Sequence, residues 1–242
     1  MMWERVRMKS TLIICSGLPY SGKSWLLAQL RETEGFAEVS LVTMDEVRVA
    51  LYGDSPDGNI TMTEHVFKNQ WLRYEILKRF VLGAPAVLTE AVMLTRRLHQ
   101  RPMVALVKEA SQYVATIERE AAVRDERAAE LHSVELRVIL CFASPQAVHA
   151  RIDGSQEERV RSHASVHNLK SMRLAYDRFE FPNRSTYVPL YLDTSAGVNA
   201  DNLEEVCAFI QGAPIDLQKN LTQKKAALDS FHQLHADIQS AN

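Results

Sequence analysis

Eight consecutive residues near the start of the sequence have the types and the spacing that phosphate binding requires. The pattern G-x-x-x-x-G-K-[ST] is met in full by Gly17, Leu18, Pro19, Tyr20, Ser21, Gly22, Lys23 and Ser24. The two glycines let the backbone curl so that successive N–H groups face phosphate oxygens, and a helix that begins there adds the positive end of its dipole. Lys23 is expected to reach the β- and γ-phosphates, and the Ser24 hydroxyl is expected to bind Mg²⁺. The sequence therefore predicts a site for ATP and Mg²⁺ in residues 17–25, with Trp25 as its last member.

The segments around this loop alternate between strand and helix patterns. A short apolar run, 11–15, precedes the loop, and apolar residues at helical spacing follow it from Trp25 to Leu30. Further β-rich runs, separated by helical segments, cover residues 39–43, 86–89, 136–142 and 187–192. Such alternation is typical of a parallel sheet with helices on both faces. We predict the three-layer α/β/α sandwich of P-loop NTPases, with a five-stranded parallel sheet, a lid and an appended C-terminal helix.

The chain divides at a turn signal, Gly212-Ala213-Pro214. Residues 1–212 are predicted to form the nucleotide-binding domain, with a lid at about 153–168, and residues 213–242 a helical extension. Apolar residues recur at helical spacing in this extension at Leu217, Leu221, Leu228, Phe231, Leu234 and Ile238. The stripe has two interpretations: the helix packs back on the domain, or it contacts a partner, including a second copy of the chain.

Two further segments carry chemistry-bearing side chains. The second predicted strand ends on Met44-Asp45-Glu46-Val47-Arg48, and the third on Val87-Leu88-Thr89-Glu90-Ala91-Val92-Met93. Together with the loop at 17–24, they resemble the polynucleotide-kinase-like branch of P-loop kinases, which includes small-molecule kinases and zeta-toxin-related kinases. The resemblance extends from about Leu12 to Asp193. It implies that Asp45 accepts the proton of an acceptor hydroxyl, that Arg48 holds the acceptor, and that Glu90 lies beside Mg²⁺.

Chemistry supports part of this assignment and leaves an alternative. A carboxylate just past the carboxyl end of a parallel strand faces the crevice where α/β folds bind ligands, so Asp45 is suitably placed to orient a nucleophile. The alternative is that Asp45 caps the helix that follows, a role that can coexist with the first. The sequence also departs from the family twice: Glu90 replaces the usual Asp, and Met93 replaces an Asn, which removes a polar contact.

Arginines lie where a lid would fall. Phosphoryl transfer concentrates negative charge on the moving group, and kinases of this kind commonly offset it with lid arginines. Arg151, Arg159 and Arg161 occupy the polar stretch that follows the fourth strand. We predict that at least one of them stabilises the transition state, with an ordinary charged surface as the alternative for each.

Composition narrows the class of protein. The net charge is −2, which gives no overall basic field of the kind that drives non-specific nucleic-acid binding. The sequence shows neither a signal-peptide pattern nor an apolar run long enough to cross a membrane, so we expect a cytoplasmic protein without membrane contact. Cys15, Cys141 and Cys207 are odd in number and lack metal-ligand spacing, which favours reduced thiols.

These observations predict an ATP-dependent kinase that transfers the γ-phosphoryl group to an acceptor hydroxyl. A small metabolite or nucleoside is the favoured acceptor, and a nucleic-acid 5′-hydroxyl is the less favoured one. Two alternatives remain: a nucleotide-dependent switch that hydrolyses ATP slowly, and a toxin-like kinase of sugar nucleotides. The sequence does not distinguish ATP from GTP, nor does it give the oligomeric state.

Overall fold

The structure is a computed structural model, and it describes residues 10–33, 36, 39–53, 62–91, 97–125, 133–155 and 188–240. All statements below concern these residues.

A five-stranded parallel sheet forms the centre of the molecule, in the order β2-β3-β1-β4-β5. Its strands are β1 (Ser10–Ser16), β2 (Ser40–Val42), β3 (Ala86–Ala91), β4 (Val134–Phe142) and β5 (Leu190–Asp193). The central strand β1 is buried on both faces, which explains why its sequence is a continuous apolar run without alternation. The predicted fold class is confirmed.

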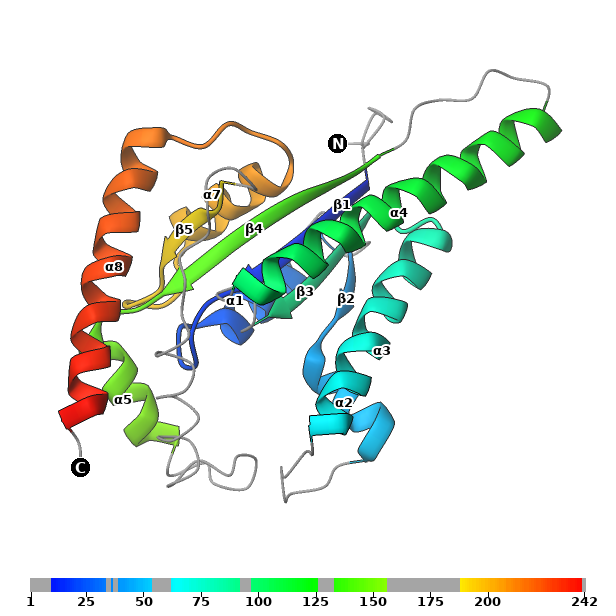
Figure 1. Cartoon of the computed structure of the whole chain (residues 1–242). Helices are drawn as coiled ribbons and strands as arrows, with labels where there is room; N and C mark the ends of the chain where they lie inside the picture. The colour runs from blue at the N-terminus through cyan, green and yellow to red at the C-terminus, as the bar shows by residue number, and fades with distance from the viewer. Residues whose placement is uncertain are drawn as a thin grey trace.

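Helices cover both faces of the sheet, as Figure 1 shows. One face carries α1 (Lys23–Glu32) and α7 (Ala200–Ile210), whose apolar side chains share a core with β1, β3, β4 and β5. The other face carries α2 (Met44–Tyr52), α3 (Met62–Val81) and α4 (Arg97–Arg124), which bury a second core against the sheet. At a rise of about 1.5 Å per residue the 28-residue helix α4 is longer than any strand, and it projects past the sheet in Figure 1.

The last helix, α8 (Leu217–Ser240), lies along β5, the strand at one edge of the sheet (Figure 1). Asn220 of α8 is only 8% exposed, and its side chain bonds the backbone of the edge strand region twice. Its Oδ1 accepts from the N–H of Tyr191 at 2.9 Å, and its Nδ2 donates to the carbonyl oxygen of Pro189 at 3.1 Å. A helix thus satisfies backbone groups that a further strand would otherwise pair.

The buried face of α8 agrees with the predicted apolar stripe at Leu234, with Phe231 packed beside it, and differs from it in the first turns of the helix. Leu217 and Leu221 are exposed, whereas Asn220, Ala227 and Leu234 are buried. Near its C-terminal end α8 also contacts α5 (Pro145–Ser155), and His149 Nε2 lies 3.3 Å from Asp237 Oδ2. The C-terminal helix therefore packs on the rest of the described chain.

The predicted lid and the expected lack of a membrane-spanning helix can be compared only with the described residues. The segment 153–168, predicted as a lid, begins inside α5, which extends to Ser155; its remaining residues lie outside the described ranges. Within the part of the chain described, no helix combines the length and the apolar character needed to cross a membrane.

Candidate active site

The loop at residues 17–24, called the phosphate-binding loop below, lies between β1 and α1 and is shaped by unusual backbone angles. Gly17 has a φ of 149°, and a Cβ there would overlap the carbonyl oxygen of Cys141. Gly22 has a φ of 80°, and its Cβ would lie 2.8 Å from Thr194 Oγ1. Tyr20 adopts a φ of 62° although it is not a glycine, so the loop stores strain at a position where most residues avoid that angle.

No side chain of the described residues caps the amino end of α1, which suits this end to bind an anion. Its N-cap is Gly22, which has no side chain to accept from the first N–H groups of the helix. The first described helical bond of this end is from Leu26 N to Gly22 O at 3.0 Å. The backbone N–H groups just after Gly22 therefore fit phosphate oxygens, and the helix dipole favours negative charge there.

Lys23 is folded back on the phosphate-binding loop. Its side chain is only 7% exposed, and its Nζ donates to the carbonyl oxygen of Leu18 at 2.7 Å. Burial lowers the pKa of the Lys23 ammonium, and the nearby Cys141, Glu90 and Cys15 oppose that shift. Burying a cation is costly unless an anion lies close to it, so the position of the Lys23 ammonium suits a site that binds an anionic ligand.

Ser24 and Glu90 come together from α1 and β3. The Ser24 hydroxyl donates to Glu90 Oε2 at 3.2 Å, and Glu90 is paired in register with Cys15, the penultimate residue of β1. Among the described residues no three His, Cys, Asp or Glu side chains converge as a metal cage. One carboxylate and one hydroxyl beside a phosphate site are a donor set that suits Mg²⁺, which usually binds through few protein oxygens and substrate phosphates.

Helix α2 starts at the carboxyl end of β2 with a capping box that does not use Asp45. Thr43 is the N-cap: its Oγ1 accepts from Glu46 N at 3.0 Å, and its own N–H donates to Glu46 Oε2 at 3.0 Å. The alternative that Asp45 caps this helix is therefore wrong. Asp45 lies in the first turn and Arg48 nearly one turn later, but their side chains are outside the description, so their predicted roles stay predictions.

Arg151 is a described member of the predicted arginine set, on α5. Its Nη1 donates to the carbonyl oxygen of Tyr20 at 2.7 Å and lies 3.3 Å from Thr194 Oγ1, and its Nη2 donates to the carbonyl oxygen of Thr194. Partial burial lowers the pKa of its guanidinium, while Asp193 opposes that shift. The structure therefore places Arg151 against the phosphate-binding loop. Arg159, Arg161 and Met93 lie outside the described residues.

Thr194 is a residue of this site that the sequence analysis did not identify. It follows β5, is fully buried, and its Oγ1 lies 2.9 Å from the carbonyl oxygen of Ser21 and 3.0 Å from that of Phe142. No sequence motif marks it, because a threonine after a strand is common. The one available signal is its position directly after the fifth strand, because the carboxyl ends of parallel strands lie on the same side of the sheet as the loop.

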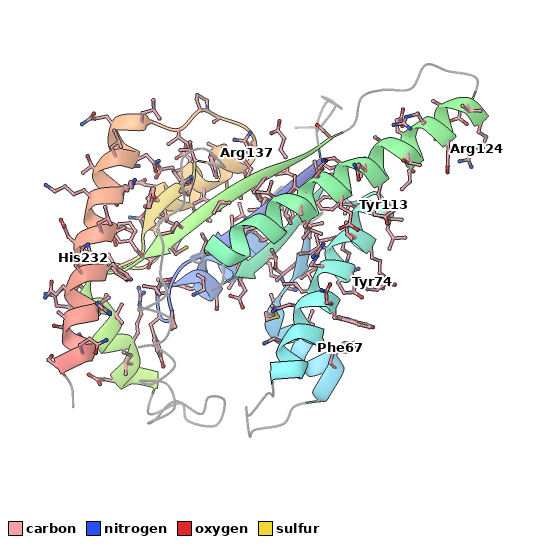
Figure 2. All side chains as sticks on the ribbon, in the orientation of Figure 1. Phe67, Tyr74, Tyr113, Arg124, Arg137 and His232 are labelled. Atoms are coloured by element: carbon pink, nitrogen blue, oxygen red, sulfur yellow. The ribbon has the colours of Figure 1, made fainter. Side chains whose placement is uncertain are left out.

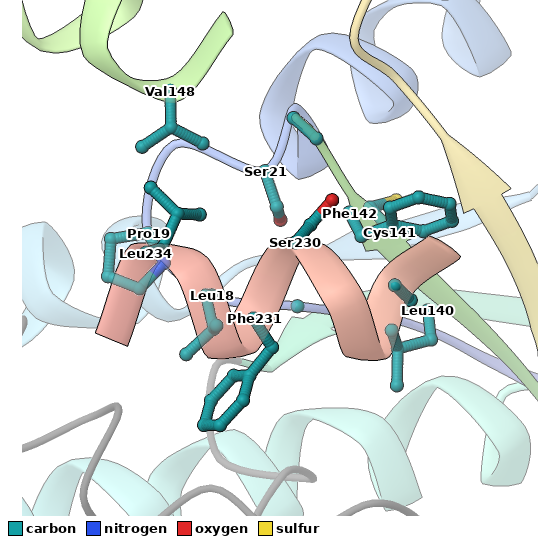
Figure 3. Close-up of a pocket in the computed structure, with 13 residues that line it drawn as sticks. Leu18, Pro19, Ser21, Leu140, Cys141, Phe142, Val148, Ser230, Phe231 and Leu234 are labelled. Atoms are coloured by element: carbon teal, nitrogen blue, oxygen red, sulfur yellow. The ribbon is translucent and has the colours of Figure 1, made fainter. Parts of the chain in front are cut away.

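The back of the phosphate-binding loop faces α8. A cavity of about 30 Å³ lies there, and its lining includes Phe231 and Leu234 of α8 and Leu18 and Pro19 of the loop (Figure 3). The hydroxyl of Ser21 is buried, lines this cavity and has no hydrogen-bond partner among the described residues. The C-terminal helix thus contributes to the wall behind the loop.

The cysteines do not form a reactive centre. Cys15 and Cys141 are buried free thiols, and Cys207 is a half-buried one. Burial raises the pKa of Cys141 to about 12 and also raises that of Cys15, which favours the protonated thiol over the nucleophilic thiolate at both positions.

Comparison with known proteins identifies the fold. No protein-family model and no curated protein matches the chain. Among solved structures, a kinase candidate from Chloroflexus aurantiacus J-10-fl matches with a TM-score of 0.58 and 18% identity, over 86% of this chain and 100% of that one. The APS kinase CysC of Mycobacterium tuberculosis matches at a TM-score of 0.45 and 14% identity, over 84% and 99% of the two chains. The Pnkp1/Rnl/Hen1 RNA repair complex matches at 0.44 and 17%, over 74% of this chain and 49% of that one.

At identities of 14–18%, these similarities establish the fold alone. The first match extends over the whole of the other chain, so the described architecture is that of a small P-loop kinase-like fold.

Proposed function

We propose that this protein is a kinase that transfers the γ-phosphoryl group of ATP, with Mg²⁺, to a hydroxyl acceptor. The observation that carries the proposal is the meeting of Lys23, Ser24 and Glu90 at the uncapped start of α1. A buried ammonium, free backbone N–H groups and a hydroxyl beside a carboxylate match the needs of nucleotide phosphates and a divalent cation at one point. The fold, which resembles that of a kinase candidate, agrees with this chemistry.

The proposed site residues fall into three groups, which bind the phosphates, the metal ion and the acceptor. The backbone of the phosphate-binding loop and Lys23 bind the phosphates, and Ser24 and Glu90 hold Mg²⁺. Magnesium supplies positive charge that offsets the phosphate oxygens. Asp45 orients the acceptor hydroxyl and takes its proton, and Arg48 holds the acceptor.

The transfer is an in-line displacement. The bond between the γ-phosphorus and its bridging oxygen breaks, a bond from the acceptor oxygen to phosphorus forms, and ADP leaves with the former bridging oxygen. We assign charge stabilisation during this step to Arg159 and Arg161, whose sequence positions follow α5. Catalysis of this kind depends on positioning and electrostatics.

For the acceptor we propose a small hydroxyl compound such as a sugar or nucleoside. The net charge of −2 gives little attraction for a polyanion, and Met93 offers no polar contact where the resembled kinases often have an amide. A nucleic-acid 5′-hydroxyl is the competing acceptor, and the same assay tests it.

The test is transfer of radiolabelled γ-phosphate from MgATP to a panel of sugars, nucleosides, sugar nucleotides and 5′-hydroxyl oligonucleotides. We expect one acceptor class to be labelled, and Lys23→Ala and Asp45→Asn each to reduce labelling at least about 100-fold. Arg137→Gln, in the amino half of β4 (Figure 2), is the matched control and should retain labelling. ATP hydrolysis without any labelled acceptor, unchanged in Asp45→Asn, would instead identify a nucleotide-dependent switch.

A further inference from the structure

Three segments that are distant in sequence converge on the phosphate-binding loop at Thr194. Thr194 Oγ1 lies within hydrogen-bonding distance of the carbonyl oxygens of Ser21 in the loop and Phe142 at the end of β4. The Thr194 N–H also donates to Phe142 O, at 2.8 Å. The guanidinium of Arg151, from α5, contacts the Thr194 hydroxyl, the Thr194 carbonyl oxygen and the carbonyl oxygen of Tyr20. Strand end, helix and loop are thus joined through one buried hydroxyl.

These bonds determine which way the peptide groups of the loop point. In a trans peptide the C=O of one residue and the N–H of the next point in opposite directions. Because the Ser21 carbonyl is turned outward to Thr194, the Gly22 N–H is turned inward, toward the phosphate side at the start of α1. The Tyr20 carbonyl, held by Arg151, likewise fixes the Ser21 N–H, which donates to Leu18 O at 3.2 Å.

The backbone of the loop needs such support. Tyr20 is held at a φ of 62°, an angle that costs a non-glycine residue free energy, so the free loop would relax away from this shape. The two outward-facing carbonyls are the points at which the neighbouring segments oppose that relaxation.

We propose that Thr194 and Arg151 are positioning residues, which hold the phosphate-binding loop in the shape that receives nucleotide phosphates. Arg151 acts through the loop backbone and does not contact the transferred phosphoryl group. The inference rests on the proposed nucleotide binding, and it adds a residue, Thr194, and a different task for Arg151.

The first experiment measures the dissociation constants of MgATP and MgADP by calorimetry in wild type, Thr194→Val and Thr194→Ser. Valine keeps the shape but removes the hydroxyl, so we expect both nucleotides to bind about tenfold more weakly, while serine restores binding to within about threefold. Thr116→Val, which changes an exposed threonine of α4, is the matched control and should bind as wild type. Melting temperatures are recorded to ensure that binding is measured on folded protein.

The second experiment separates the two tasks of Arg151 with ADP, which lacks the γ-phosphoryl group. A loop-positioning role predicts that Arg151→Lys and Arg151→Gln weaken MgADP and MgATP equally, and raise the KM for ATP more than they lower kcat. A contact with the transferred group predicts unchanged MgADP affinity and a lower kcat. Arg137→Gln, in strand β4, is the control for loss of a half-buried arginine away from α5 and the loop.

The outcomes are distinguishable from failure of the proposed function. If wild type binds neither nucleotide, nucleotide binding itself is wrong and the positioning role falls with it. If wild type binds both and Thr194→Val or Arg151→Gln binds MgADP as tightly, the kinase proposal stands and the positioning role is refuted.

Discussion

Replacing Asn220 by alanine tests whether the C-terminal helix is part of the fold or a dispensable addition. The Asn220 side chain satisfies two backbone groups beside the buried edge strand β5, the Tyr191 N–H at 2.9 Å and the Pro189 carbonyl at 3.1 Å. Leaving a buried polar group unpaired costs about 1–3 kcal/mol, and alanine recovers roughly 0.5 kcal/mol through its helix propensity. With two groups left unpaired, the free energy of unfolding should therefore fall by about 1.5–5.5 kcal/mol.

Urea unfolding followed by far-UV circular dichroism measures this loss. Gln218→Ala, on the exposed face of the same helix, is the matched control and should change the unfolding free energy by less than about 0.5 kcal/mol. A loss below about 0.5 kcal/mol in Asn220→Ala would refute the reasoning, since the edge groups would then find equivalent partners without α8.

Three further predictions concern the site. Lys23→Met should abolish ATP binding and stabilise the nucleotide-free protein, because burial disfavours the Lys23 ammonium and so lowers its pKa. In thermal melts the gain in stability should be complete at pH values below the lowered pKa, and it should shrink as the pH rises toward 10.5, the ordinary value for lysine. Glu90→Gln should raise the Mg²⁺ concentration for half-maximal activity by about tenfold or more, measured by titration at saturating ATP; an unchanged requirement would remove Glu90 from the metal site. Gly197→Ala should lower stability by about 1–2 kcal/mol and alter tryptophan fluorescence, because Gly197 has a φ of 93° and a Cβ would overlap the Trp25 ring; a silent substitution would contradict this geometry.

The sequence predicted the sheet and the phosphate-binding loop well because both are encoded locally. The loop combines glycines, a lysine and a serine at fixed spacing, and the buried strands read as short apolar runs. The fourth predicted strand, 136–142, differs from β4 by only two residues at its start. A parallel sheet buries both faces of its central strands, so composition alone marks them.

The sequence did not identify the N-cap of α2, because two nearby residues are suited to that position. Both Thr43 and Asp45 are good N-caps, and the sequence analysis weighed only Asp45. Thr43 takes the role because Glu46, three residues later, completes a reciprocal capping box. Asp45 is therefore not the N-cap, and its role in orienting an acceptor stays a proposal.

Contacts between distant segments were not predictable from the sequence. Thr194 and Asn220 are ordinary polar residues in sequence, and each is defined by the backbone atoms it meets after folding. The first part of the predicted stripe on α8 was wrong for the same reason. The strand edge there presents backbone N–H and C=O groups, so Asn220 is buried while Leu217 and Leu221 remain exposed. Leu234, near the end of the same stripe, is buried as predicted.

The residues that contact the back of the phosphate-binding loop are synthesised long after the loop itself. Thr194 and Ser21 are 173 residues apart, and α8, which backs the same loop, follows Thr194 in the chain. A ribosome therefore makes the phosphate-binding loop long before it makes the groups that shape it. A nascent chain that ends before β5 contains every residue of the nucleotide motif, yet it lacks the contacts that orient the loop backbone. On the proposed function, nucleotide binding would begin only when nearly the whole described chain has been synthesised and its fold is complete.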